Sequence, residues 1–390
     1  MLTQPPSKLP RVGTTIFTVM SRLAQECGAI DLSQGFPDFD PPPRLVDLVA
    51  ECMRRGVNQY APMAGWPALL EAIAAKVGDL YGHCVDPQAS VTVTSGATEA
   101  LFCAVHAVVR PRDEVILLEP AYDSYEPAVE LAGGHAVRVP LRRPGFGVDW
   151  DRVRDAINPR TRLLIVNSPH NPTGAVFAPG DLDALEDILH DNSVLLLSDE
   201  VYEHIVFDGR AHQSLLSRPA LAARGFVVSS FGKTYHCTGW KVGYCVAPPG
   251  LTAEFRKVHQ FVQFAVASPM QAALAQFLVE CPDHARELGA FYQRKRDRFL
   301  ELLAATPLRP IPTAGTYFQL ADYSAVSQQP DVEFARALTR DIGVAAIPVS
   351  VFSAGVLPER LVRFCFAKSD ATLDAAGERL SRLVAPGGCR

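Results

Sequence analysis

The feature that most constrains this fold is a regular alternation, in the middle of the chain, of short apolar runs and longer helix-patterned segments. In the longer segments, apolar residues recur every three to four positions before Gly, Pro or Asn. Such alternation is typical of an α/β domain with a mostly parallel sheet and helices on both faces. The apolar runs lie at 91–95, 114–120, 162–169, 193–200, 226–233 and 241–248.

The character of the sequence changes after about residue 282, where a charged helical pattern begins. An apolar run at 315–323, a second helical pattern at 331–342 and a strand pattern at 360–367 follow. We therefore expect a large domain at 46–281 and a smaller α+β domain at 282–390. Residues 1–45, which are rich in proline, are expected to form an arm associated with the small domain. The apolar window 261–279 is interpreted as a core helix.

Composition argues against several classes of protein. The chain has 37 Lys plus Arg against 42 Asp plus Glu, a formal charge of −5, which does not favour nucleic acid or an anionic membrane as a partner. Its nine cysteines are scattered and form no C-x-x-C pair, so we expect neither disulfides nor a metal site. No signal-peptide pattern and no long apolar span is seen. A cytoplasmic location is the expectation.

Polar residues follow several of the predicted strands, at the sheet edge where α/β proteins bind ligands. Ser95 to Thr98 are small residues at a predicted helix start, which suits a phosphate, although plain N-capping is an equally good interpretation. Asn167 and Asn171 lie in the irregular segment NSPHNPTG, which can orient them toward a ligand or can simply be a turn. Neither signal is specific alone.

Two further strand ends carry charged residues. Asp199 ends one apolar run, where a carboxylate needs a partner such as a cationic ring nitrogen, a helix cap or a surface ion pair. Lys233 follows another run, where burial would lower the pKa of its amine and make it a nucleophile. A phosphate, a cationic ring and an amine-reactive carbonyl are the three groups that pyridoxal phosphate presents.

One competing motif uses the same lysine. Ser230 and Lys233 match the S-x-x-K pattern of serine acyl-transferases, but the supporting K-T-G and S-D-N elements are absent. Dinucleotide, P-loop, zinc-protease and hydrolase-elbow motifs are absent as well. The serine acyl-transferase therefore remains an unfavoured alternative of another class.

Longer segments resemble a known family. SQGFPDF, NQYAPMAG, TSGATEAL, NSPHNPTG, SDEVYEHI, SSFGKTYHCTGWKVGYCVAP and AAIPVSVF are similar to the fold-type I pyridoxal-phosphate aminotransferases of class I/II. Within that family they resemble the kynurenine/glutamine transaminase subgroup, and most closely its bacterial methionine aminotransferases. The resemblance runs from about residue 9 to the C-terminal helix. It implies the aspartate aminotransferase-like fold and pyridoxal 5′-phosphate as cofactor.

The resemblance also implies a role for each residue at the cofactor. Lys233 would bind the cofactor covalently and then carry the proton at the substrate α-carbon, and Asp199 would pair with the ring nitrogen. Asn171 and Tyr202 would hydrogen-bond the phenolic oxygen of the cofactor, and Tyr122 would stack on the face of its ring. The cofactor phosphate would be bound by Gly96, Ala97, Thr98, Ser230 and Lys241. Lys241 stands where many aspartate-type relatives have arginine.

Substrate contacts follow from the same resemblance. Arg363 would bind the substrate α-carboxylate with Asn171, and Gly35 would let the backbone approach the substrate. Tyr60 matches a tyrosine that the family directs across a homodimer interface to the partner's phosphate. The side-chain pocket is expected to use Ile16, Phe17 and Tyr60.

These implications define the expected activity. The chain would transfer the amino group of a large neutral L-amino acid to a 2-oxo acid by a ping-pong mechanism, with methionine favoured over glutamine and aromatic amino acids. A cysteine-S-conjugate β-lyase is the alternative within the cofactor class. A cofactor-sensing regulator is disfavoured, because the resemblance begins near residue 9 and the net charge is negative.

Overall fold

Seven strands form the central sheet of the computed structural model, which describes residues 6–355 and 359–384. Their order is β2-β8-β7-β6-β5-β3-β4, and β8 runs antiparallel to both β2 and β7, while the other neighbouring pairs are parallel. The bounds are β2 Val91–Thr94, β3 Glu114–Glu119, β4 His135–Pro140, β5 Thr161–Asn167, β6 Leu195–Asp199, β7 Gly225–Ser230 and β8 Gly243–Val246. The predicted mostly parallel sheet is confirmed.

Side chains alternate between two hydrophobic clusters along each buried strand, so both faces of the sheet are covered. In β3, Val115 and Leu117 belong to one cluster while Ile116 and Leu118 belong to the other. The first cluster is completed by α5 Gly96–Val108, α6 Tyr125–Leu131 and α11 Pro249–Val262. The second includes α3 Pro67–Tyr81, α7 Trp150–Ala156, α8 Pro179–Leu189, α9 Pro219–Ala222 and α12 Ser268–Glu280. The short helices α4 Pro87–Ser90 and α10 Phe231–Thr234 complete this part.

Strand β4 is absent from the sequence prediction, for a physical reason. It is the outer strand beside β3, and only one of its six residues is buried. An edge strand exposed in this way lacks the continuous apolar run by which the other strands were recognised.

The C-terminal part contains a second, four-stranded antiparallel sheet, ordered β12-β13-β10-β9. Its strands are β9 Arg309–Pro310, β10 Phe318–Asp322, β12 Ile347–Pro348 and β13 Leu361–Cys365. Its helices are α13 Asp283–Ala304, α14 Asp331–Ala337 and α15 Asp370–Leu380, and a π-helical turn at Leu338–Ile342 continues α14.

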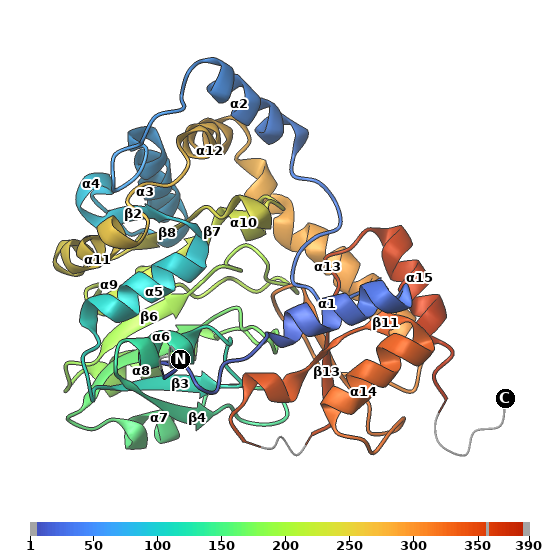
Figure 1. Cartoon of the computed structure of the whole chain (residues 1–390). Coiled ribbons are helices and arrows are strands. Elements are labelled where there is room, and N and C mark those ends of the chain that lie inside the picture. Colours follow the sequence, from blue (N-terminus) through green and yellow to red (C-terminus); the bar gives the residue numbers. More distant parts are fainter. Residues whose placement is uncertain (1–5, 356–358, 385–390) are drawn as a thin grey trace, which may run out of the picture.

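The N-terminal segment packs against this C-terminal part, as Figure 1 shows for the blue helix α1 Ile16–Cys27 among orange and red elements. Strand β1 Ile30–Asp31 pairs in parallel with β11 Val344–Ala345. Helix α2 Pro43–Arg54 instead lies beside α12, with Pro43 at its first turn, a position where proline costs no hydrogen bond. None of the described helices is long and apolar enough to cross a membrane.

The expectation of one core helix over 261–279 holds for its later part, α12, which has buried residues, but not for the residues before Ser268. Helix α11 ends at Val262 and α12 begins at Ser268, with Phe264 between them at φ +66°. Phe261 is 85% exposed in this chain. The apolar window was therefore the junction of two helices and carries part of an exposed apolar surface.

Candidate active site

A cavity of about 440 Å³ lies at the carboxyl ends of β5, β6 and β7. Both the central sheet and the C-terminal part contribute to its walls, together with the segment that follows α1. The sequence-predicted residues that line it are Phe17, Gly35, Gly96, Ala97, Thr98, Tyr122, Asn171, Asp199, Tyr202, Ser230, Lys233, Lys241 and Arg363. The fold thus brings together residues separated by more than three hundred positions.

Two residues of the expected side-chain pocket lie elsewhere. Ile16 is half-buried and packs against the hydrophobic core. Tyr60 is 83% exposed and stacks edge-to-face on Phe264, with 5.6 Å between the ring centroids. Neither contributes to the cavity wall of its own chain.

The start of α5 forms one end of the cavity. Gly96 has φ +71°, a conformation that favours glycine, and a Cβ at this position would lie 3.0 Å from Lys241 Nζ and displace that side chain. Lys241 Nζ donates to Thr98 Oγ1 over 3.2 Å, and burial lowers the pKa of this amine. The Ser95 side chain makes no cap hydrogen bond, so plain N-capping by this residue is not seen. Backbone N–H groups, the helix dipole and an ammonium group therefore converge on an anion site.

Asp199 supplies the opposite charge at the end of β6. Its carboxylate is buried, accepts from Tyr125 OH at 2.8 Å and from Val201 N at 3.3 Å, and makes no ion pair with any described residue. Burial raises the pKa of this carboxyl to about 6, against the effect of both hydrogen bonds. A buried carboxylate in this state would be stabilised by a cation in the cavity.

Lys233 lies on α10, directly after β7. Its Nζ donates to Tyr317 OH at 2.9 Å and to the Gly35 carbonyl at 3.2 Å, and Tyr317 OH in turn donates to that carbonyl at 2.5 Å. Burial lowers the pKa of the lysine amine to about 8. The uncharged amine that nucleophilic attack requires is therefore far more populated near neutral pH than in an ordinary lysine.

This lowered pKa predicts the pH dependence of the reaction of Lys233 with an aldehyde. Below about pH 8 the amine is protonated and cannot attack, so the rate of covalent labelling should rise through pH 8 and level off above it. Stopped-flow absorbance with pyridoxal phosphate and cofactor-free protein between pH 6.5 and 9.5 measures this rate. A rate still rising steeply at pH 9.5, as for an ordinary lysine, would contradict the assignment.

The loop after β5 positions Asn171. Asn167 donates to the carbonyls of Asp199 and Pro169 at 2.8 and 3.2 Å, and its Oδ1 accepts from the Asn171 backbone at 2.8 Å. The side-chain polar atoms of Asn167, which lines the cavity, are thus bonded to the loop and to β6, although both asparagines had been considered as ligand contacts. Asn171 keeps its amide group facing the cavity.

Arg363, on β13, enters the cavity from the C-terminal part. Its side chain is 1% exposed, and it donates to Asn171 Oδ1 at 2.7 Å and to the Ser33 carbonyl at 3.2 Å. Its Nε has no hydrogen-bond partner among the described residues, which also give it no carboxylate. Burial lowers the pKa of the guanidinium. A buried cation with a free donor is a ready site for the carboxylate of a ligand.

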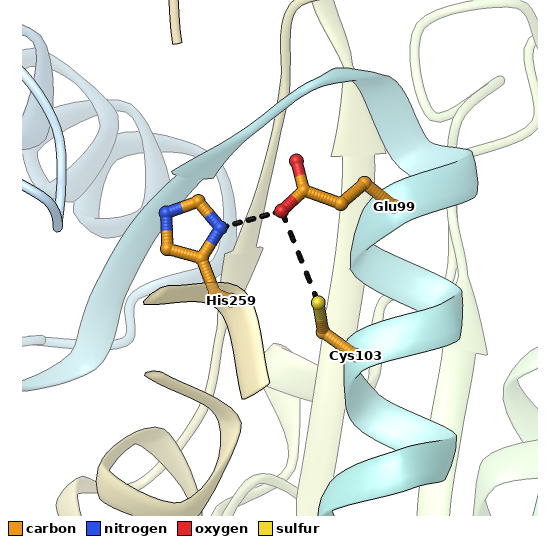
Figure 2. Close-up of side chains that lie close together, drawn as sticks. All are labelled: Glu99, Cys103 and His259. Carbon is orange, nitrogen blue, oxygen red and sulfur yellow. Dashed lines mark hydrogen bonds and ion pairs between the residues drawn. The ribbon is translucent and has the colours of Figure 1, made fainter. Parts of the chain in front are cut away.

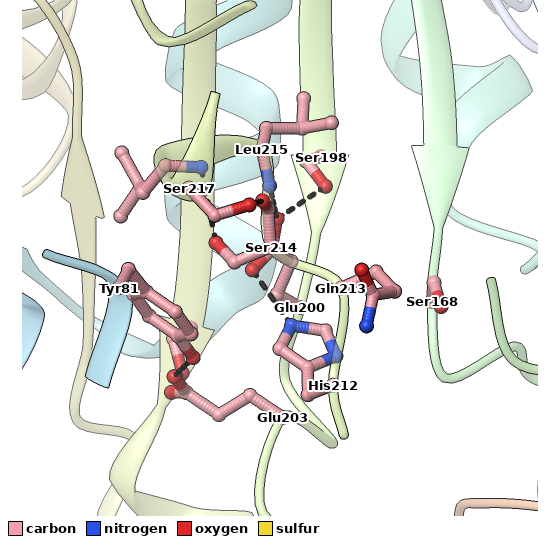
Figure 3. Close-up of polar contacts among 12 residues, drawn as sticks. Tyr81, Ser168, Ser198, Glu200, Glu203, His212, Gln213, Ser214, Leu215 and Ser217 are labelled. Atoms are coloured by element: carbon pink, nitrogen blue, oxygen red, sulfur yellow. Dashed lines mark hydrogen bonds and ion pairs between the residues drawn. The ribbon is translucent and has the colours of Figure 1, made fainter. Parts of the chain in front are cut away.

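Ser198 and Glu200, on either side of Asp199 in the chain, do not line the cavity, and Figure 3 shows their polar contacts. Glu200 accepts from Ser198 Oγ at 2.8 Å and from Leu215 N at 3.1 Å, and lies 2.9 Å from His212 Nε2. Adjacent strand residues face opposite sides of a sheet, so Asp199 reaches the ligand side while Glu200 organises the chain behind it.

Three aromatic residues that contact the lining side chains were not predicted from the sequence, and one of them, Phe318, itself lines the cavity. Tyr125 was interpreted only as part of a helix, yet it holds Asp199. Tyr317 and Phe318 were noted only as part of an apolar run, yet Tyr317 holds Lys233, and the centre of the Phe318 ring lies 3.9 Å from the Arg363 guanidinium. A Cβ on Gly35 would lie 2.9 Å from the same ring, which explains why glycine stands there. An aromatic pair in a strand pattern gives no signal of such contacts.

Residues 28–380 match the model of the family described as aminotransferase class I and II. The chain belongs to this family. Among its relatives, the methionine aminotransferase of Escherichia coli K12 is 53% identical over 379 residues, 97% of this chain and 98% of that protein. The kynurenine–oxoglutarate transaminase 3 of Mus musculus is 34% identical, with 95% and 88% covered.

Solved structures agree with the assignment. An E. coli structure described as having a methionine aminotransferase function superimposes with a TM-score of 0.96 at 52% identity, covering 98% of this chain and all of that one. The N-succinyldiaminopimelate aminotransferase of Mycobacterium tuberculosis gives 0.95 at 42% identity, with the same coverage. The expected fold and family are confirmed.

This aminotransferase is a pyridoxal-phosphate enzyme, and its cavity fits that cofactor. The start of α5 with Lys241 suits the phosphate, the buried Asp199 carboxylate suits a pyridinium nitrogen, and the Lys233 amine suits the aldehyde. The serine acyl-transferase alternative is not favoured, because it would need Lys233 next to the Ser230 hydroxyl. Instead, Ser230 Oγ accepts a hydrogen bond from Gly232 N, and Lys233 Nζ donates to Tyr317 OH.

Proposed function

We propose that this aminotransferase takes its amino group from a large neutral L-amino acid, methionine first, and passes it to a 2-oxo acid by a ping-pong mechanism. The buried Arg363 carries the proposal, because it lines the same cavity as Lys233 and Asp199 and has no carboxylate partner among the described residues. A guanidinium in this position binds the α-carboxylate that amino acids and 2-oxo acids share.

The cofactor supplies an electron-withdrawing ring that makes the substrate α-proton acidic. In the proposal, Asp199 keeps the ring nitrogen protonated, Asn171 and Tyr202 hydrogen-bond the phenolic oxygen, and Tyr122 covers the ring. Lys233 accepts the α-proton, and Tyr317 holds the lysine nitrogen when it is free. Ser230 joins the α5 residues and Lys241 at the phosphate. Gly35 provides its carbonyl and leaves space for the Phe318 ring.

The cavity favours a neutral substrate side chain. Phe17, Phe36 and Phe318 supply apolar wall, whereas its cations are Lys233, Lys241 and Arg363. All three already have proposed partners, so within this subunit no described cation of the wall remains for a distal carboxylate. Such a cavity requires a substrate side chain without a carboxylate. Methionine, which the 53% identical relative is named for, has such a side chain, whereas N-succinyldiaminopimelate does not.

A panel of amino donors with a fixed 2-oxo acid tests the substrate proposal. We expect methionine to have the largest kcat/KM, with glutamine and aromatic amino acids close behind, because apolar pockets discriminate by only about 1–3 kcal/mol per methylene. A preference for aspartate or N-succinyldiaminopimelate would overturn it. Pyruvate and ammonia released from cysteine conjugates faster than transamination would favour the β-lyase.

We also propose a homodimer with shared active sites. Exposed apolar side chains gather on α2, the loop at 55–66, and the α11–α12 junction, where Tyr60 and Phe261 are 83% and 85% exposed. Patches of this kind mark interfaces. In this proposal Tyr60 reaches the phosphate of the cofactor bound by the partner subunit. Within each subunit, residues 46–281 form the large domain, residues 282–390 form the small domain, and residues 1–45 associate with the small domain. A cytoplasmic location stays a prediction.

The substitution Phe261→Asp tests the dimer. A buried aspartate at the interface would cost several kcal/mol, so sedimentation velocity should show monomer, and affinity for pyridoxal phosphate should fall about tenfold with the loss of the partner's Tyr60. Leu131→Asp is the matched control, since Leu131 is an exposed apolar residue on α6, away from this surface. A Phe261→Asp protein that is dimeric with full affinity would refute the shared site.

A further inference from the structure

A buried glutamate lies in the first turn of α5, beside the site proposed for the phosphate. Glu99 is 9% exposed, and its Oε2 accepts a hydrogen bond from the backbone N–H of Ser95. An ionised carboxylate at this place would repel a dianionic phosphate bound by Gly96 to Thr98. Its charge therefore needs compensation.

The compensation comes from His259 on α11, as Figure 2 shows. This imidazole is fully buried, with Nδ1 2.5 Å from Glu99 Oε1 and Nε2 2.9 Å from the Met63 carbonyl. A carbonyl oxygen can only accept, so Nε2 carries a proton, and a second proton must lie between Nδ1 and Oε1. Wherever that second proton resides, the pair as a whole carries no net charge.

Cys103 completes a cluster whose ligand atoms lie within 4.8 Å of one another, which raises the possibility of a metal ion. The geometry argues against one. Two ligands of a tetrahedral zinc ion lie about 3.3 Å apart, because each bond is about 2.0–2.1 Å long. The 2.5 Å between Glu99 Oε1 and His259 Nδ1 leaves room for a proton only. Cys103 Sγ lies 3.9 Å from the same oxygen and contributes at most a weak hydrogen bond.

The pair connects two segments that the proposed function places at phosphates. Glu99 fixes Ser95, at the turn that leads into α5. His259 fixes Met63, in the 55–66 loop that carries Tyr60, and Ser268 Oγ fixes the same loop by donating to the Gln59 carbonyl at 2.5 Å. The contacts therefore form one chain from the cofactor site of this subunit to the loop directed at the partner's site.

We propose that Glu99 and His259 are positioning residues for the cofactor phosphate. As a neutral pair they hold the α5 N-terminus in its anion-binding conformation, and they tie it to the Tyr60 loop, so that each subunit's phosphate site is linked to the loop that serves its partner. This inference rests on the proposed function and extends it to residues that touch neither the cofactor nor the substrate.

The test compares two ligands, pyridoxal phosphate and phosphate-free pyridoxal, on cofactor-free Glu99→Leu and His259→Phe. In Glu99→Leu the Ser95 N–H and His259 Nδ1 both lose their partner, and loss of a charge-assisted hydrogen bond corresponds to roughly a 10- to 100-fold weaker Kd for pyridoxal phosphate. Affinity for pyridoxal should change by less than about twofold, because pyridoxal makes no phosphate contact. His106→Gln, on the same helix, and Cys103→Ser are controls expected to bind both ligands normally.

Two readouts separate positioning from general destabilisation. Hydrogen exchange in 57–65 should accelerate in both pair variants and stay unchanged in the controls. In ¹⁵N NMR of the wild type, the imidazole signals that are lost in His259→Phe should be those of a ring protonated at Nε2. Equal losses for both ligands, unchanged affinity, or stoichiometric zinc in the wild type would overturn the inference while leaving the aminotransferase intact. A wild-type protein that binds no pyridoxal phosphate would instead overturn the proposed function.

Discussion

Replacing Lys233 by alanine is expected to lower turnover about 10⁴-fold, the upper range for losing a positioned acid/base, because covalent attachment of the cofactor is lost as well. The chain should still fold, since Lys233 ends in the cavity and the substitution removes no core side chain. Without the lysine side chain, Tyr317 OH can still donate its hydrogen bond to the Gly35 carbonyl. Steady-state transamination measures the loss, and dialysis after denaturation shows whether the cofactor is covalently held.

The lysine assignment has a sharper test than loss of rate. Small alkylamines can enter the space that the side chain leaves and supply a neutral nitrogen base, so they should restore part of the rate in Lys233→Ala, more so as the pH rises. The control is Lys257→Ala, which removes an exposed lysine and should leave turnover unchanged. A positioned acid/base residue raises the rate by about 10²- to 10⁴-fold. Lys233→Ala turnover above about a tenth of the wild-type rate would therefore show that this lysine is not the acid/base.

The second large effect is expected from Arg363→Lys. Lysine keeps the charge but cannot provide two parallel donors to a carboxylate, and it cannot lie flat against Phe318 as the guanidinium does. We expect kcat/KM for methionine to fall roughly 10²- to 10³-fold, or about 3–4 kcal/mol, mainly through KM.

A substrate without the carboxylate isolates that interaction. For the amine that corresponds to decarboxylated methionine, wild type and Arg363→Lys should be equally slow, since neither can use the contact. Arg363→Lys with the kcat/KM of wild type for methionine would show that the α-carboxylate binds elsewhere. A similar loss for both compounds would point to a distorted cavity.

Much of the cofactor site could be predicted from the sequence because parallel strands end at one edge of the sheet. Asn171, Asp199 and Lys233 each follow an apolar run, and β5, β6 and β7 lie side by side in the structure. Arg363 and Tyr60 could be assigned only through the family resemblance. An arginine in a strand and a tyrosine in a loop carry no signal of their own.

Other parts of the site depend on contacts that no local pattern encodes. Tyr317 meets Lys233 across the boundary between the two sheets, and Tyr125 meets Asp199 from a helix far away in sequence. Local periodicity reports which face of an element is buried but not which partner covers it. The break between α11 and α12 was missed for a related reason: apolar residues that form an exposed surface look like core residues in the sequence.

The most direct test of the account is a half-reaction with the cofactor-loaded enzyme and L-methionine, without any 2-oxo acid. We predict one equivalent of the corresponding 2-oxo acid per active site and no free ammonia, because the nitrogen stays on the cofactor. A second 2-oxo acid, added afterwards, should then be converted to one equivalent of its amino acid. Failure of product to form until both substrates are present, or release of ammonia in proportion to methionine consumed, would contradict the account.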